Sequence, residues 1–113
     1  MLDELIGTVK GLVQKIWEFI KKIIVGILKF FGHIVSFFKD PQRLKKIKED
    51  ENIIAVTVKD NLDNGNYNIV NCLFDKDTET IVDYEENSLG ITADELDEET
   101  QNNFAGKDMI ILQ

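Results

Sequence analysis

The chain has 113 residues, of which 43% are hydrophobic and 30% charged, with one cysteine, one histidine and a net charge of −8. This length allows one small domain with an appendage and excludes two full domains. A single cysteine, Cys72, excludes an internal disulfide framework, and one cysteine with one histidine cannot complete a structural zinc site. One cysteine also favours a reducing compartment.

The charge is divided unevenly along the chain. Residues 1–50 carry ten Lys or Arg and six Asp or Glu, a net charge of +4, whereas residues 51–113 carry three and fifteen, a net charge of −12. Binding to phosphates needs a basic face, so the acidic part argues against nucleic acid as a ligand. The basic part suits anionic lipid or the acidic part of a second copy. Because the first charges are Asp3 and Glu4, we expect no secretory signal.

Residues 3–38 are predicted to form one long helix. Apolar residues recur there at alternating spacings of three and four over five heptads, which is the a/d pattern of a coiled coil. Most are Ile or Val, and β-branched residues at both positions favour three or more strands, so we expect a homo-oligomer of at least three copies. The predicted oligomerisation or membrane face consists of Ile6, Val9, Val13, Ile16, Trp17, Ile20, Ile23, Ile27, Phe30, Phe31, Ile34, Phe37 and Phe38.

This predicted helix is apolar nearly all round, which requires burial in protein or in lipid. Leu5, Leu12, Phe19 and Ile24 widen the apolar face, and a narrow polar stripe contains Lys15, Lys22 and Lys29. The length from Trp17 to Phe38 matches a bilayer, but a lysine at the centre of a membrane helix costs about 3 kcal/mol. The helix is therefore expected to lie in the membrane interface, to line a wet lumen in an oligomer, or to form a protein-only core.

Asp40 and Pro41 mark the end of the long helix and the start of a short basic one over residues 41–50, because Asp is a good N-cap and Pro suits the first helical position. A basic cluster next to a membrane helix binds anionic lipid and keeps the following segment on the cytoplasmic side. The predicted anionic-surface residues are Lys39, Arg43, Lys45, Lys46 and Lys48. A solvated linker helix is the alternative.

Residues 52–113 are expected to form a small acidic domain of order β-β-β-α-β with a mostly antiparallel sheet, so the fold class is α+β. Strands are predicted at 52–60, 67–75, 79–84 and 108–112, with turn residues between them. Thr92 and Glu95 have the spacing of a capping box that would open a helix over 93–104. The division predicted from these patterns is 1–39, 40–51 and 52–113.

No pattern of catalytic residues is present, so we expect no enzyme and no cofactor. There is no phosphate-binding glycine loop, nucleophile elbow or histidine cluster. Asp75, Asp77, Glu79, Asp83 and Glu86 have the spacing of a calcium loop, but Thr80 stands where a glycine is needed, and strands are predicted on both sides, so no metal is expected. The acidic run 94–99 is either solvated helix charge or a docking face for a basic partner.

Three functions follow from these patterns. The first is a non-enzymatic protein that self-associates through residues 3–38 on or in a membrane and displays the acidic domain on the cytoplasmic side. The second is a soluble structural homo-oligomer or filament in the cytoplasm with the same helices as its core. The third is a small membrane-permeabilising effector or toxin.

Overall fold

The computed structural model describes residues 2–112. The elements follow in chain order as α1 (Leu2–Ile16), the 3-10 turn η1 (Trp17–Phe19), β1 (Lys21–Leu28), the π-helical turn η2 (Phe30–Val35), α2 (Ser36–Phe38), α3 (Pro41–Glu49), β2 (Ile53–Asn61), β3 (Tyr67–Asp75), β4 (Thr80–Ile81), α4 (Tyr84–Asn87), β5 (Leu89–Leu96), α5 (Glu98–Phe104) and β6 (Met109–Leu112). The α+β class is therefore confirmed.

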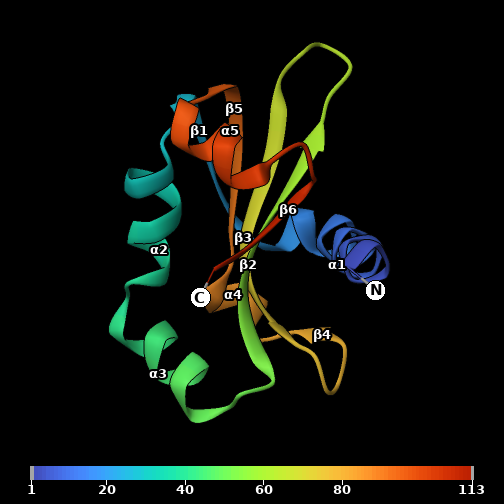
Figure 1. The fold of residues 1–113 in the computed structure, drawn as a ribbon, viewed down its shortest axis with the longest axis vertical. Helices are drawn as coiled ribbons and strands as arrows, with labels where there is room; N and C mark the ends of the chain where they lie inside the picture. Colours follow the sequence, from blue (N-terminus) through green and yellow to red (C-terminus); the bar gives the residue numbers. More distant parts are fainter. Residues whose placement is uncertain (1, 113) are drawn as a thin grey trace.

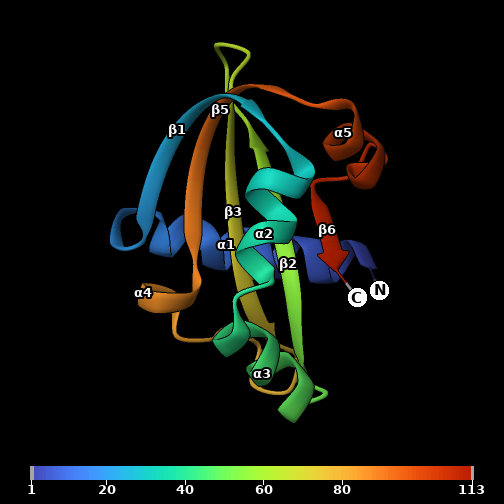
Figure 2. The same ribbon diagram turned by 90° about the vertical axis from the view of Figure 1, so that its left-hand side faces the viewer.

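The strands form one sheet in the order β1-β5-β3-β2-β6, with β4 paired to β3. β1 runs parallel to β5, and every other pairing is antiparallel, which confirms the mostly antiparallel sheet. Helices cover both faces: α1 crosses one face, while α2 and α3 lie on the opposite side (Figure 1). In the view turned by 90°, α1 passes behind the strands and α2 lies in front of them (Figure 2).

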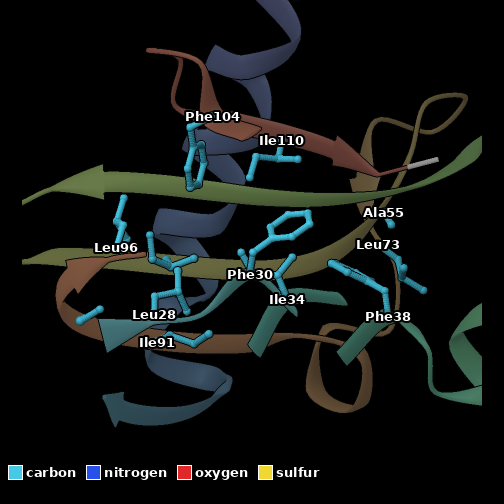
Figure 3. Packing of buried hydrophobic residues seen from close by; sticks show 12 residues of the cluster. Leu28, Phe30, Ile34, Phe38, Ala55, Leu73, Ile91, Leu96, Phe104 and Ile110 are labelled. Carbon is cyan, nitrogen blue, oxygen red and sulfur yellow. The ribbon is translucent and has the colours of Figure 1, made fainter. Parts of the chain in front are cut away.

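Each face of the sheet has its own apolar cluster. On the α1 side, Val9 and Val13 pack with Val56, Val70 and Cys72 from the central strands. On the other side the residues come from β1, η2, α2, α5 and the central strands, and Figure 3 shows their side chains lying together on this face of the sheet. The labelled members of this second cluster are Leu28, Phe30, Ile34, Phe38, Ala55, Leu73, Ile91, Leu96, Phe104 and Ile110.

The prediction of one continuous helix over residues 3–38 is wrong. The α-helix ends at Ile16, and the segment KKIIVGIL forms β1. A run of β-branched residues fits a pleated strand better than a helix, and Gly26 lowers helix propensity further. Because nearly every residue of the run is apolar, its apolar positions fit the period of a helix and that of a strand equally well. In the part of the chain that the structure covers, no helix is long and apolar enough to cross a membrane.

The helix predicted at 93–104 begins too early. Residues 89–96 are strand β5, hydrogen-bonded to β1 on one side and β3 on the other. α5 starts at Glu98, with Asp97 as its N-cap. Two ladders of backbone hydrogen bonds, with Ile91 and Ala93 buried, outweigh the capping box that Thr92 and Glu95 suggested.

The remaining strands agree with the predictions in position, except for β4. Only Thr80 and Ile81 pair, because Glu79 and Asp83 have left-handed backbone angles, with φ of 56° and 43°, that a strand cannot continue through. The basic helix is confirmed as α3, and the Asp40 carboxylate accepts a hydrogen bond of 3.0 Å from the Gln42 N–H, as an N-cap does.

A short series of hydrogen bonds joins β2, β3 and η2 beside the second cluster. The Thr57 hydroxyl donates to the buried Asn71 Oδ1 at 2.8 Å, and Asn71 Nδ2 donates to the His33 carbonyl at 3.0 Å. This carbonyl belongs to η2, so a directional bond fixes where residues 30–35 sit on the strands.

Candidate functional site

Large apolar side chains are exposed in a single stretch of the chain. Among the described side chains, the exposed ones are Phe19 (66%), Ile23 (39%), Ile24 (86%), Ile27 (46%) and Phe31 (62%). All five lie between residues 19 and 31, on β1 or on the turns that flank it. Single exposed apolar residues are ordinary, whereas a group confined to one element is a candidate contact surface.

β1 is an edge strand, so its backbone contributes to the same surface. One side of the strand pairs with β5, from Lys21 opposite Leu89 to Leu28 opposite Leu96. Its other side has no neighbouring strand among residues 2–112, and it forms the left-hand margin of the sheet in Figure 2. Unpaired N–H and C=O groups on an edge strand are a template for pairing with another chain. We call this strand, together with the five exposed side chains, the β1 edge.

The side chains of β1 alternate between the two faces of the sheet. Ile23 lies opposite the buried Ile91, so Ile23 and Val25 point to the face of the second cluster, and at the end of the strand Leu28 joins the same cluster. Ile24 lies opposite Thr92 and points to the other face, where it is 86% exposed. The β1 edge is therefore apolar on both faces.

The structure distributes the predicted oligomerisation face instead of gathering it on one side. Six members are buried in the chain's own core: Val9, Val13, Ile20, Phe30, Ile34 and Phe38. Four are half-buried: Ile6, Ile16, Trp17 and Phe37. The other three, Ile23, Ile27 and Phe31, belong to the β1 edge.

The two most exposed apolar residues of the β1 edge, Ile24 and Phe19, were predicted only to flank the oligomerisation face. If the segment is a helix, both residues lie beside the a/d positions. If KKIIVGIL is a strand, Ile24 points away from the face that carries Ile23 and Val25. The apolar, β-branched character of the segment was the signal that pointed to a strand.

The three lysines of the predicted polar stripe do not share a face. Lys15 and Lys29 are exposed. The Lys22 ammonium donates to the Trp17 carbonyl at 2.9 Å and lies 5.7 Å from the centre of the indole ring. Lys22 therefore helps to hold the turn between α1 and β1.

Part of the predicted anionic-surface cluster is occupied within the chain. The Arg43 guanidinium donates to the carbonyls of Phe37 and Glu86, each at 3.0 Å, and lies 3.7 Å from the Phe37 ring centre. Lys46 pairs with Asp83 at 3.0 Å, and Lys45 lies 3.8 Å from Glu49. Lys39 and Lys48 are exposed and form no ion pair within residues 2–112. The cluster thus mainly joins α3 to α2 and α4.

A cavity of about 200 Å³ lies between α1 and the strands β2 and β3. Its lining residues are Lys10, Val13, Gln14, Trp17, Val58, Asp60, Asn68 and Val70. These residues include no Ser, Thr, Cys or His, so they supply no nucleophile paired with an imidazole. The Lys10 ammonium forms an ion pair of 3.0 Å with Asp108 instead.

Cys72 is buried, and the acidic residues of the calcium-like window stabilise a turn. Burial raises the pKa of the Cys72 thiol to about 12, and the side chain is fully enclosed, so no thiolate is available near neutral pH. Within residues 2–112 no group of three or more His, Cys, Asp or Glu side chains is arranged to hold a metal ion. The Asp75 carboxylate of the calcium-like window accepts from the Asp77 and Thr78 N–H groups at 2.8 and 3.2 Å, which closes the turn.

Asp97 fixes the end of β1. Its carboxylate accepts from the Thr100 N–H at 2.9 Å and from the Phe30 N–H at 3.2 Å, and its own N–H donates to the Leu28 carbonyl at 2.9 Å. Burial raises the pKa of Asp97, but the hydrogen bonds from Thr100 and Phe30, together with nearby His33, lower it to a net value below the usual 3.8. One side chain therefore caps α5 and anchors the strand that carries the β1 edge.

No protein-family model, curated protein or solved structure matches this chain.

Proposed function

We propose that this protein is a non-enzymatic, self-associating module whose contact surface is the β1 edge. The observation that carries the proposal is that every large apolar side chain exposed among the described residues lies on this edge strand or its two flanking turns. Pairing a second strand there satisfies the free backbone groups and removes these side chains from water.

The opposite margin of the sheet is less suited to this contact. β6 has only four residues, and Met109 and Ile110 are already buried. Short edge strands are one of the ways in which proteins limit pairing. β1 is twice as long, and its central side chains are apolar, with lysines only at its start. The expectation of three or more copies depended on a heptad-patterned helix, and an edge strand carries no such preference.

The experiment that tests the proposal is light scattering coupled to size-exclusion chromatography over a range of protein concentrations. The unmodified chain should have a mass above 13.0 kDa at high concentration. Ile24→Lys places a charge in the middle of the edge, so the mass should fall to that of a monomer. Asn61→Lys adds the same charge to an exposed position at the end of β2 and should leave the mass unchanged. A monomer at every concentration overturns the proposal.

Attachment to an anionic membrane surface is a second candidate, favoured by the exposed lysines around the apolar residues. Phe19, Ile24 and Phe31 lie close in sequence to Lys21 and Lys29, a combination that binds the interface of acidic bilayers. Flotation with phosphatidylserine vesicles distinguishes the candidates. Binding that is lost in Ile24→Lys supports a membrane role, whereas a protein that stays at the bottom of the gradient excludes it. A location on the cytoplasmic side of a membrane remains a prediction.

A further inference from the structure

We propose that the occupant of the β1 edge is the β1 edge of a second copy, paired antiparallel about a two-fold axis at Ile24. In this arrangement Lys21 of each copy faces Glu95 of the other. The inference rests on the proposed function and specifies its partner and geometry.

The charges along the edge favour an antiparallel partner. Lys21 and Lys22 stand at the start of β1, and Asp94 and Glu95 stand near the end of β5. Because β1 and β5 are parallel, the basic and acidic pairs lie at opposite ends of the same edge. All four side chains are exposed.

Antiparallel pairing of two identical edges brings Lys21 and Lys22 of each copy to the end of the other copy that carries Asp94 and Glu95, where Lys29 is the one basic residue. Parallel pairing would bring lysines next to lysines, and like charges placed opposite each other destabilise a sheet. Antiparallel pairing about a two-fold axis also makes a closed dimer, in which the same patch serves on both copies. The charges of two β1 edges are therefore complementary in the antiparallel orientation and not in the parallel one.

The register follows from the backbone and the lysines. In an antiparallel ladder, two residues opposite each other either both point their N–H and C=O groups toward the other strand or both point them away. Neighbouring residues in a strand point in opposite directions, so the two-fold axis between two identical strands must pass through a residue that lies opposite its own copy. A centre at Ile24 places Lys21 opposite Ile27 and Lys22 opposite Gly26. A centre at Val25 would place Lys21 opposite Lys29, which is unfavourable. A centre at Ile23 would place Lys21 opposite Val25, two residues away from the position that is paired with Glu95.

The Ile24 register also brings opposite charges to the same level of the paired strands. Lys21 of the second copy lies opposite Ile27, and Glu95 lies opposite Ile27 on the other side, on β5. Lys21 of the second copy then stands two strand spacings from Glu95, about 10 Å between backbones, which two long side chains can close. Lys22 of the second copy lies opposite Gly26, which has no side chain to separate it from the neighbouring Asp94.

Lys21 and Glu95 are the best pair for a test because neither takes part in the ion pairs found within residues 2–112. Lys22 is less suitable, since it is hydrogen-bonded to the Trp17 carbonyl. Within one copy, Lys21 and Glu95 are separated by six residues along the paired strands, about 20 Å. An interaction between them therefore reports contact between copies.

The first experiment is a charge-exchange series analysed by sedimentation equilibrium. Lys21→Glu and Glu95→Lys should each raise the dimer dissociation constant about tenfold, because two contacts become repulsive. The double variant Lys21→Glu with Glu95→Lys should return it to within about twofold of the original. Added salt should reduce the differences between variants.

The second experiment is oxidative crosslinking, which locates the axis. Ile24→Cys places two thiols opposite each other at the two-fold axis, within reach of a disulfide. Ile27→Cys is the matched control, because in this register its two copies lie about 20 Å apart. The native Cys72 is buried and does not compete. We expect a crosslinked dimer only from Ile24→Cys.

The outcomes separate this inference from the proposed function. If the chain dimerises and Ile24→Lys disrupts the dimer, but the double charge variant stays as weak as the single ones, the antiparallel register is overturned and self-association stands. Crosslinking of Ile27→Cys in preference to Ile24→Cys overturns the register as well. A chain that is monomeric at all concentrations overturns both, and an assembly larger than a dimer overturns the two-fold closure.

Discussion

At the scale of single residues, Asp97 joins two elements that are far apart in sequence. Asp97→Ala removes the cap of α5 and the acceptor of the Phe30 N–H, so we expect the free energy of unfolding to fall by about 2 kcal/mol. Urea unfolding followed by circular dichroism measures the loss. Glu99→Ala, which removes an exposed acid from the first turn of the same helix, should change stability by less than about 0.5 kcal/mol. Equal losses in the two variants would contradict the assigned role.

The lowered pKa of Asp97 gives this contribution a defined pH dependence. A carboxyl whose pKa is lower in the folded than in the unfolded state contributes stability that is fully present above the unfolded pKa, near 4, and is lost as the pH falls through the folded pKa. The stability difference between the unmodified chain and Asp97→Ala should therefore be constant between pH 5 and 7 and shrink below about pH 4. A difference that grows on acidification would contradict this.

At the scale of elements, the approach of Gly90 on β5 to Trp17 on η1 sets how α1 meets the sheet. A Cβ atom at position 90 would lie 2.7 Å from Cζ3 of the Trp17 ring, which is rigid. Gly90→Ala should therefore lower the free energy of unfolding by about 1–3 kcal/mol, because the ring or the strand has to shift. The measurement is thermal unfolding with tryptophan fluorescence, which reports the ring directly.

The matched control for this prediction is Gly11→Ala. A Cβ atom there meets nothing within 4 Å, and the residue is in the interior of α1. Alanine in a helix interior is better than glycine by up to about 1 kcal/mol, so this variant should be more stable than the unmodified chain. Opposite signs for the two substitutions are the expected result.

Elements whose local signals agree could be predicted from the sequence. β2, β3, β6 and α3 lie close to their predicted positions, because β-branched runs, turn residues and an Asp-Pro start all point the same way. β1 and β5 could not be predicted from the sequence, because pairing with neighbouring strands decides their conformation. KKIIVGIL suits a helix or a strand by spacing alone, and the parallel ladder with residues 89–96 decides between them.

At the scale of the whole molecule, each apolar cluster contains residues from both the basic part (1–50) and the acidic part (51–113) of the chain. Of the 21 buried hydrophobic residues found among those described, seven lie in residues 1–39. Val9 and Val13 close one face of the sheet, and Leu28 and Ile34 close the other. Residues 52–113 therefore depend on the preceding segment for cover on both faces.

We accordingly expect a fragment containing only residues 52–113 to lack a cooperative unfolding transition. Without residues 1–39, β5 loses its parallel neighbour, and both faces of the sheet become exposed to water. Circular dichroism melting and proton NMR dispersion of the fragment test this, and the full chain is the control. A sharp melting transition of the fragment would establish 52–113 as an independent domain.

The candidate site was predictable in its segment but not in its residues. The surplus of apolar residues before Asp40 pointed to burial against another molecule. The sequence did not reveal that ten of the thirteen residues in the predicted oligomerisation face are buried or half-buried within the chain itself. The exposed remainder at Phe19, Ile24 and Phe31 follows from the edge position of β1, which depends on residues about 70 positions later.

The pairing of β1 with β5 has a consequence for the synthesis of the protein. β1 ends at Leu28, and its neighbour in the sheet ends at Leu96. At roughly 5–20 residues per second, several seconds pass between the translation of these two strands. During that interval the segment KKIIVGIL has no strand of its own chain to join. Polysomes carrying several nascent copies bring such segments close together, so the first strand that β1 meets can belong to another molecule.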